Sequence, residues 1–267
     1  MIRSRGERLA EVAAGLFAAV VLLILYAPVL INALFSVVAI DDGRIVPGTF
    51  SLSPYRTVWS DPSVVSSLRI SAVVAAVAVS AATVLAIAFA LYTGREGAIG
   101  RRSIELAIYV PFLLPPIITG LSLLVACANA GVSRGLASIV VGHAVFVLAV
   151  TYRLVKTRLD AMPRALAEAS ADLGATSFQT FRHVLLPQLM SAIVTGALLA
   201  LTLSFDETLI TVFVSGDQMT LPLRLWAMMR VGFTQEINAL VTVVLAVSIA
   251  LAVVVAFRLK PAAFEDH

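Results

Sequence analysis

Charged residues are scarce in this sequence. Asp, Glu, Lys and Arg make up 13% of the 267 residues, whereas hydrophobic residues make up 60%. An average soluble domain is about one quarter charged and about half apolar. The composition therefore excludes an ordinary soluble protein and predicts a chain that crosses a membrane, at about 20 largely apolar residues per span. We expect residues 1–267 to form a single transmembrane domain, because six spans would leave no room for a separate soluble one.

Cysteine and histidine are also nearly absent. Cys127 is the only cysteine and there are three histidines, so neither an intrachain disulfide nor a cysteine-rich metal site is possible. An intramembrane zinc protease needs a His-Glu-x-x-His cluster, and a serine protease needs a paired Ser and His. The histidines are too scattered for either, and His143, alone on an apolar helix, is predicted to be a buried, hydrogen-bonded side chain. We therefore predict that the chain is not an enzyme.

A phosphate-binding loop is missing as well. The glycine-rich segment from Gly94 to Ser103 has arginine where the motif requires lysine, and it follows an apolar helix instead of a strand. The chain is thus predicted to bind neither ATP nor any other cofactor by itself.

Long apolar runs account for most of the sequence. They predict six membrane-spanning helices at about 12–39, 68–92, 106–128, 136–152, 188–214 and 237–257. An all-α, polytopic membrane fold follows. Pro111, Pro115 and Pro116 fall in the third run, and because proline removes a backbone donor we expect a bend there.

The basic residues predict the orientation of these spans. Thirteen of the nineteen Lys and Arg residues lie in the segments on the side of the termini, and only six lie on the other side. Positive residues favour the cytoplasm, so both termini are predicted to be cytoplasmic. The basic residues form no single face, so the net charge of +3 is not taken as a sign of nucleic-acid binding.

The longest inner connection, residues 152–187, carries five of these thirteen residues and contains good helix formers. A connection of this length is usually functional. Gly174 is expected to stop a first short helix in the left-handed conformation, and Pro187 to end a second one. The result is a helical elbow outside the bilayer. The alternative is an amphipathic hairpin that rests on lipid headgroups.

This elbow resembles the EAA loop of ABC importer permeases, whose pattern is Glu-Ala-Ala, three residues, Gly, nine residues, Ile, any residue, Leu-Pro. The sequence matches the pattern at five positions with the spacing intact, namely Glu168, Ala169, Gly174, Leu186 and Pro187, and departs from it at Ser170 and Val184.

The resemblance implies a MetI-like permease of the bacterial inner membrane, with residues 152–187 as the cytoplasmic coupling loop. It implies as partners an ABC ATPase dimer that binds ATP and Mg²⁺, a second, homologous but non-identical permease subunit, an extracytoplasmic solute-binding protein and membrane lipid. The residues expected to couple to the ATPase are Glu168, Ala169, Ser170, Asp172, Gly174, Leu186 and Pro187.

Shorter matches extend over nearly the whole chain. The segments 50–55, 204–207, 221–222 and 236–239 are similar to the spermidine/putrescine subgroup, in particular to its PotC-like subunit. The resemblance implies import of a polyamine or a related amine by ATP-driven alternating access. Opines and aminophosphonates are handled by the same subgroup and stay open as solutes.

Two carboxylates, Asp206 and Glu207, lie inside the fifth apolar run. Carboxylates at membrane depth normally face a partner, a water-filled cavity or a substrate path. As a path for a cation they would act with Ser204, Phe205 and Thr208. Alternatively the pair is structural and bonds to Arg224, Arg230 or a partner subunit. In an ion-coupled secondary transporter, the alternative class of protein, the same pair would bind Na⁺ or H⁺.

Overall fold

The computed structural model describes residues 5–38, 40–41, 44–46, 48–232 and 234–258. The fold is all-α, as predicted, apart from two paired strands of two residues each, Ile40–Asp41 (β1) and Arg44–Ile45 (β2). Contacts divide the chain into two compact units. The first contains residues 1–62 and 228–247, and the second contains residues 63–227 and 248–267.

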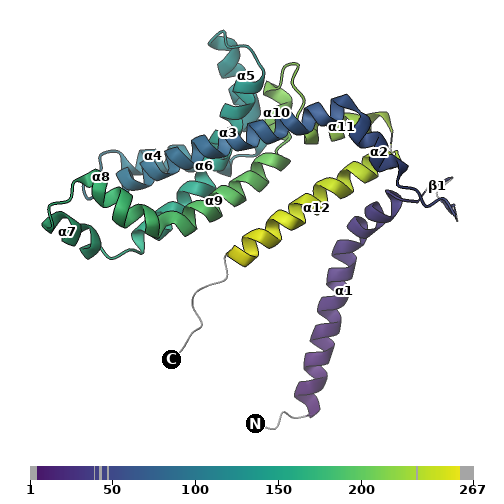
Figure 1. Ribbon diagram of the computed structural model, residues 1–267, viewed down its shortest axis with the longest axis horizontal. Coiled ribbons are helices and arrows are strands. Elements are labelled where there is room, and N and C mark those ends of the chain that lie inside the picture. Colours follow the sequence, from purple (N-terminus) through teal and green to yellow (C-terminus); the bar gives the residue numbers. More distant parts are fainter. Residues whose placement is uncertain (1–4, 39, 42–43, 47, 233, 259–267) are drawn as a thin grey trace. The chain divides into compact units, whose positions relative to one another are not determined.

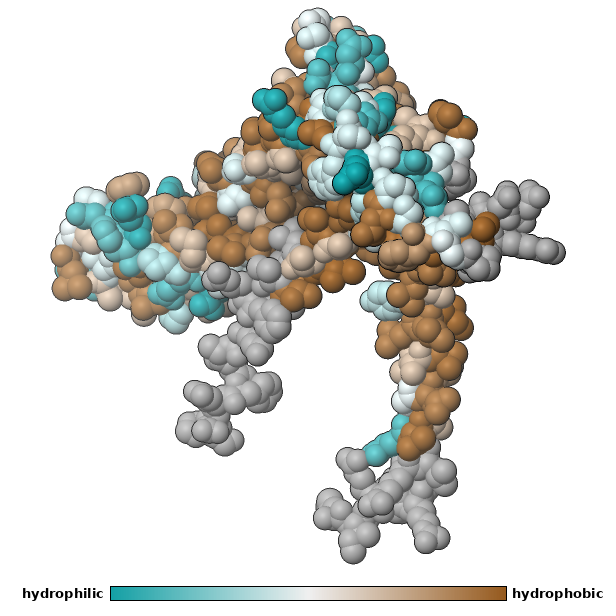
Figure 2. Space-filling model, turned by 45° about the vertical axis from the view of Figure 1, so that its right-hand side comes forward, coloured by the Kyte–Doolittle hydropathy of each residue, from teal (hydrophilic) through white to brown (hydrophobic). Residues whose placement is uncertain are grey.

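The first unit contains α1 (Arg5–Phe35), α2 (Ser53–Ser60) and the beginning of α12 (Gln235–Arg258). Asn32 of α1 donates hydrogen bonds to the carbonyl oxygen of Asn238 at 3.2 Å and to Thr242 Oγ1 at 3.1 Å. A side-chain amide suits this task, because polar contacts join apolar helices inside a bilayer. Most of α1 is exposed and apolar, as the brown column in Figure 2 shows, which is expected of a helix that faces lipid or another subunit.

The second unit is built on three long helices that run side by side in Figure 1: α3 (Pro62–Thr93), α6 (Leu136–Asp160) and α9 (Leu186–Asp206). Small residues allow this close packing. On α3, fully buried alanines recur every four residues at Ala78, Ala82, Ala86 and Ala90. A Cβ on Gly196 of α9 would lie 3.3 Å from the backbone of α6.

The third predicted span is bent, as the proline pattern indicated. It consists of α4 (Arg101–Leu113) and α5 (Pro116–Asn129), with an angle of 111° between them. Pro111 lies inside α4 and does not end it. The break falls at Leu114 and Pro115, between the end of α4 and the start of α5. The Thr119 hydroxyl donates a 3.2 Å hydrogen bond back across the bend to the carbonyl oxygen of Pro111, and so satisfies an acceptor that the break leaves free.

Four described helices are long and apolar enough to cross a membrane: Glu11–Phe35, Pro62–Thr93, Leu136–Asp160 and Ser177–Asp206. The bent pair makes a fifth crossing if it forms one span, and the apolar helix Gln235–Ala250 is shorter. The structure thus supports a multi-pass membrane protein, and the count of six spans stays a prediction.

The remaining helices of the second unit are short. The predicted elbow consists of α7 (Ala165–Asp172), α8 (Ser177–Thr180) and a π-helical turn, η1 (Phe181–Leu185). After α9 come α10 (Leu209–Val214) and α11 (Leu221–Val231). Figure 1 shows α7 and α8 at one end of the α3–α6–α9 layer and α10 beside α5, away from that end.

Candidate functional site

The predicted elbow is a helical hairpin, and Gly174 forms its turn. Its φ is +80°, the left-handed conformation predicted from the sequence. The amide of Gly174 donates to the carbonyl oxygen of Ala171 at 2.8 Å, and that of Ala175 donates to Ser170 at 3.1 Å. These two bonds form a Schellman motif, which satisfies the last carbonyls of α7. The turn is therefore fixed by backbone hydrogen bonds within residues 170–175.

The second arm of the hairpin begins with a capping box. The amide of Thr176 donates to Gln179 Oε1 at 2.7 Å, and the amide of Gln179 donates to Thr176 Oγ1 at 3.3 Å. Its sequence signal is Thr-x-x-Gln, one form of the Ser/Thr-x-x-Glu/Gln capping-box pattern. The Ser170 and Thr180 hydroxyls lie 3.0 Å apart and join the two arms.

The expectation that Pro187 ends the second helix is wrong. Residues Ser177–Asp206 form one continuous helix, and Pro187 lies in the first turn of α9. The π turn η1 precedes it, with the amide of Leu186 bonded to the carbonyl oxygen of Phe181, five residues back. The wider turn accommodates a residue that lacks an amide and whose ring would clash with a carbonyl in a regular α-helix. The elbow is thus continuous with the fifth predicted span.

The outer face of the hairpin carries most of the predicted coupling residues. Glu168, Ala169, Asp172 and Gly174 are exposed, and Ser170 is half-buried against Thr180. Leu186 and Pro187 lie at the start of α9, away from the turn. The structure therefore divides the seven residues into an exposed group on α7 and its turn, and a pair that belongs to the helix below.

Sequence analysis missed two large apolar side chains on this hairpin. Leu173 is 89% exposed and Phe178 is 70% exposed. Their only sequence signal is their position on either side of the turn. Exposed apolar side chains on an otherwise polar hairpin favour a contact with another protein or with lipid.

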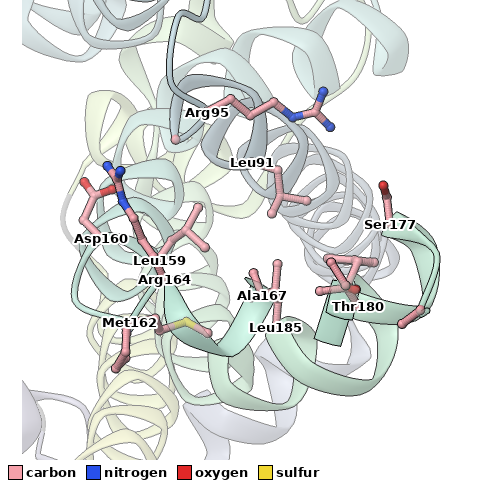
Figure 3. A pocket seen from close by; sticks show the side chains of 15 residues that line it. Leu91, Arg95, Leu159, Asp160, Met162, Arg164, Ala167, Ser177, Thr180 and Leu185 are labelled. Atoms are coloured by element: carbon pink, nitrogen blue, oxygen red, sulfur yellow. The ribbon is translucent and has the colours of Figure 1, made fainter. Parts of the chain in front are cut away.

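A cavity of about 570 Å³ separates α7 from the ends of α3 and α6. Leu91 and Leu185 point toward one another across it in Figure 3, and Ala167 of α7 lies beside Leu185. Arg164 pairs with Glu96 across this region, which joins the hairpin to the 94–100 connection. Both connections thus lie at the same end of the second unit.

The fifth predicted span is broken at the two predicted carboxylates. α9 ends at Asp206, Glu207 has an extended backbone with ψ near 112°, and α10 begins at Leu209. Asp206 is exposed, whereas Glu207 is only 8% exposed. Glu207 Oε1 accepts a 2.9 Å hydrogen bond from the amide of Ile210, so this carboxylate caps the first turn of α10. The structure separates two residues that the sequence places together.

The other predicted path residues also divide. Phe205 and Thr208 are half-buried beside the break. Ser204 is buried, and its hydroxyl lies 2.8 Å from Nδ1 of His143. Nε2 of His143 lies 2.9 Å from the hydroxyl of Thr211. His143 itself is 1% exposed, which confirms the prediction of a buried, hydrogen-bonded histidine.

Comparison with known proteins identifies the type of molecule. Residues 86–261 match the family described as binding-protein-dependent transport system inner membrane component. The chain is 36% identical over 231 residues to the putrescine transport system permease protein PotI of Escherichia coli (strain K12), covering 83% of this chain and 81% of the relative. It is 31% identical over 207 residues to the spermidine/putrescine permease protein PotC of Haemophilus influenzae, covering 76% of this chain and 80% of the relative.

Solved structures show the same fold at low sequence identity. A bacterial ABC transporter involved in the import of the acidic polysaccharide alginate matches with a TM-score of 0.79 and 17% identity, over 97% of this chain and 100% of that one. The MetNI methionine ABC transporter in an inward-facing conformation matches with a TM-score of 0.61 and 21% identity, over 77% of this chain and 99% of that one.

Proposed function

This chain belongs to the family of binding-protein-dependent transport system inner membrane components and is an ABC importer permease, and we propose that it moves a polyamine or a related small amine inward by alternating access. The observation that carries the proposal is the exposed hairpin at α7 and α8, because it combines a rigid turn with unpartnered apolar side chains on a membrane protein.

The hairpin is the proposed contact with an ABC ATPase dimer. Leu173 and Phe178 would enter a groove of the ATPase, and burying each would contribute about 1.5–3 kcal/mol. Glu168 is exposed, and its carboxylate forms no hydrogen bond within the described part of the chain; Arg164 on its own helix flank pairs with Glu96 instead. We therefore assign Glu168 to the contact with the ATPase.

The continuous helix Ser177–Asp206 supplies a mechanical connection. Because α8, η1 and α9 form one rod, a displacement of the hairpin by the ATPase moves the cytoplasmic half of the fifth span. ATP binding would close the ATPase pair, the hairpins would follow, and the permease pair would open outward to receive solute from a binding protein. In this scheme ATP and Mg²⁺ belong to the ATPase, and this chain supplies no cofactor and no hydrolytic step.

The proposed solute site is the break after Asp206. The carboxyl end of a half-helix carries partial negative charge, and broken helices of transporters place such ends near cations. Asp206 is exposed at this end of α9, and the half-buried Phe205 precedes it in the chain. An organic ammonium fits this chemistry, and the relatives PotI and PotC are named for putrescine and spermidine. The fold itself does not fix the solute, because a neighbour of the same fold imports an acidic polysaccharide.

The remaining partners and the orientation are part of the same proposal. The second permease subunit is a homologous, non-identical chain, and the solute arrives on an extracytoplasmic binding protein. Both termini and the hairpin face the cytoplasm of a bacterial cell. The shared position of the 94–100 connection and the hairpin at one end of the second unit supports placing these two connections on the same side of the membrane.

Reconstitution tests the function directly. The chain, its second permease, the ATPase and the binding protein are placed in proteoliposomes, and putrescine and spermidine are compared with an opine and an aminophosphonate. We expect uptake and stimulated ATP hydrolysis with the polyamines. Stimulation by an opine or aminophosphonate alone would overturn the solute assignment and leave the importer intact. Uptake driven by an ion gradient without ATP would overturn the importer mechanism.

A further inference from the structure

The break in the fifth span is held from the side by one buried residue of another helix. His143 lies on α6, and its two ring nitrogens reach different halves of the broken span: Nδ1 lies 2.8 Å from Ser204 Oγ of α9, and Nε2 lies 2.9 Å from Thr211 Oγ1 of α10. All three side chains are at most 3% exposed. One imidazole thus bridges the two ends that flank Asp206 and Glu207.

One neutral tautomer of His143 satisfies every hydrogen in this set. In it the Thr211 hydroxyl donates its one hydrogen to the carbonyl oxygen of Glu207 at 3.0 Å. Thr211 then accepts from His143, and Nε2 carries the ring hydrogen. In a neutral imidazole Nδ1 accepts the hydroxyl hydrogen of Ser204. Every donor in this set therefore has an acceptor, and the histidine needs no second proton.

Packing explains why the ring can reach α10. Gly142 lies next to His143, and a Cβ there would come within 2.7 Å of the Ile210 side chain. On the opposite side, a Cβ on Gly120 of α5 would lie 3.0 Å from the Cα of Ile210. The short helix α10 is therefore seated between two glycines, and the His143 bonds set its distance from α9.

We propose that His143 is a positioning residue for transport, which holds α9 and α10 at the separation that keeps Glu207 buried as a cap and leaves Asp206 exposed to the solute. The effect of His143 on transport rests on the proposed function. The geometric part concerns this chain alone and is measured without any solute.

Thiol labelling of α10 tests the geometry in the assembled transporter. In a Cys127→Ser background, Val214→Cys places a near-isosteric reporter at a fully buried position of α10, and Val155→Cys places a matched reporter at a fully buried position of α6. His143→Leu removes both bonds. We expect labelling at position 214 to become at least about fivefold faster, the change that corresponds to the loss of a typical buried hydrogen bond, with labelling at position 155 unchanged.

His143→Gln is the matched rescue variant, because its amide can accept from Ser204 and donate to Thr211. Slow labelling at position 214 should return with Gln. Faster labelling at both reporters in His143→Leu would show general loosening and would overturn the specific role. Unchanged labelling at position 214 would overturn it as well.

Uptake kinetics test the transport consequence. With putrescine-loaded binding protein, His143→Leu should lower the maximal uptake rate about fivefold or more, with the half-saturating concentration of binding protein unchanged, and His143→Gln should restore the rate. If uptake is normal while position 214 labels faster, His143 positions the helix break without a role in transport, and that part of the proposal is wrong. If Asp206→Asn leaves uptake intact, the proposed solute site fails, and the labelling result still decides the geometry.

Discussion

Glu207 Oε1 lies 2.9 Å from the backbone amide of Ile210, three residues further along the chain. This bond makes the carboxylate a helix cap and removes it from the surface, while the preceding Asp206 stays exposed. The two acidic residues therefore have separate tasks, and substitutions should separate them.

We expect Asp206→Asn to reduce putrescine uptake in proteoliposomes about tenfold, which corresponds to about 1.4 kcal/mol of lost attraction, without changing the thermal stability of the purified complex. Glu207→Ala should lower the stability by about 1 kcal/mol, because an unsatisfied amide is left at the start of α10. Glu207→Gln keeps an acceptor oxygen and serves as the control. Equal uptake losses for Asp206→Asn and Glu207→Gln would contradict this division.

Gly174→Val should disturb the hairpin turn. The φ of +80° at this position strains any side chain, and most of all a β-branched one, at about 1–2 kcal/mol or more. No atom lies within 4 Å of a Cβ placed there, so the effect comes from the backbone alone. We expect loss of uptake and weaker co-purification of the ATPase, with insertion of the chain preserved.

Asn tolerates the left-handed conformation, so Gly174→Asn should retain most of the activity lost in Gly174→Val. If Gly174→Val left uptake and solute-stimulated ATP hydrolysis unchanged in reconstituted vesicles, the hairpin would not be the coupling element.

Leu173→Ser and Phe178→Ser should each weaken ATPase binding by about 1.5–3 kcal/mol if both side chains become buried in the complex. Val231→Ser is the matched control, because Val231 is 91% exposed at the end of α11, outside the hairpin. Isothermal titration of the detergent-solubilised permease pair with the ATPase would measure the difference. Stronger binding to lipid vesicles than to the ATPase, lost in both Ser variants, would instead favour a hairpin that rests on headgroups.

Cysteine accessibility tests the orientation. In the Cys127→Ser background, we expect Gly100→Cys and Ser177→Cys to label only from the cytoplasmic side, and Ser133→Cys and Asp217→Cys only from outside. All four positions are exposed. Labelling of positions 100 and 177 from outside in intact cells would reverse the proposed topology. Asp42, the fifth position suited to this test, lies outside the described residues.

The sequence alone determined the features that depend on local covalent geometry. The left-handed conformation of Gly174 could be predicted because it depends only on the residue itself and on the end of its helix. The bend in the third span follows from Pro115 and Pro116. The apolar runs predicted where most helices lie, since a span must satisfy its own backbone groups inside the bilayer. The spaced match at Glu168, Ala169, Gly174, Leu186 and Pro187 indicated the family.

Only the tertiary structure decided which of these residues are buried or exposed and which distant residues they bond to. Pro187 continues a helix because the π turn before it opens the backbone, and no local rule predicts that choice. Asp206 and Glu207 are neighbours with equal charge, yet the break after α9 exposes one and buries the other. His143 could be predicted to be bonded, but its partners lie 61 and 68 residues away, and such pairings depend on packing between helices, which sequence periodicity does not specify.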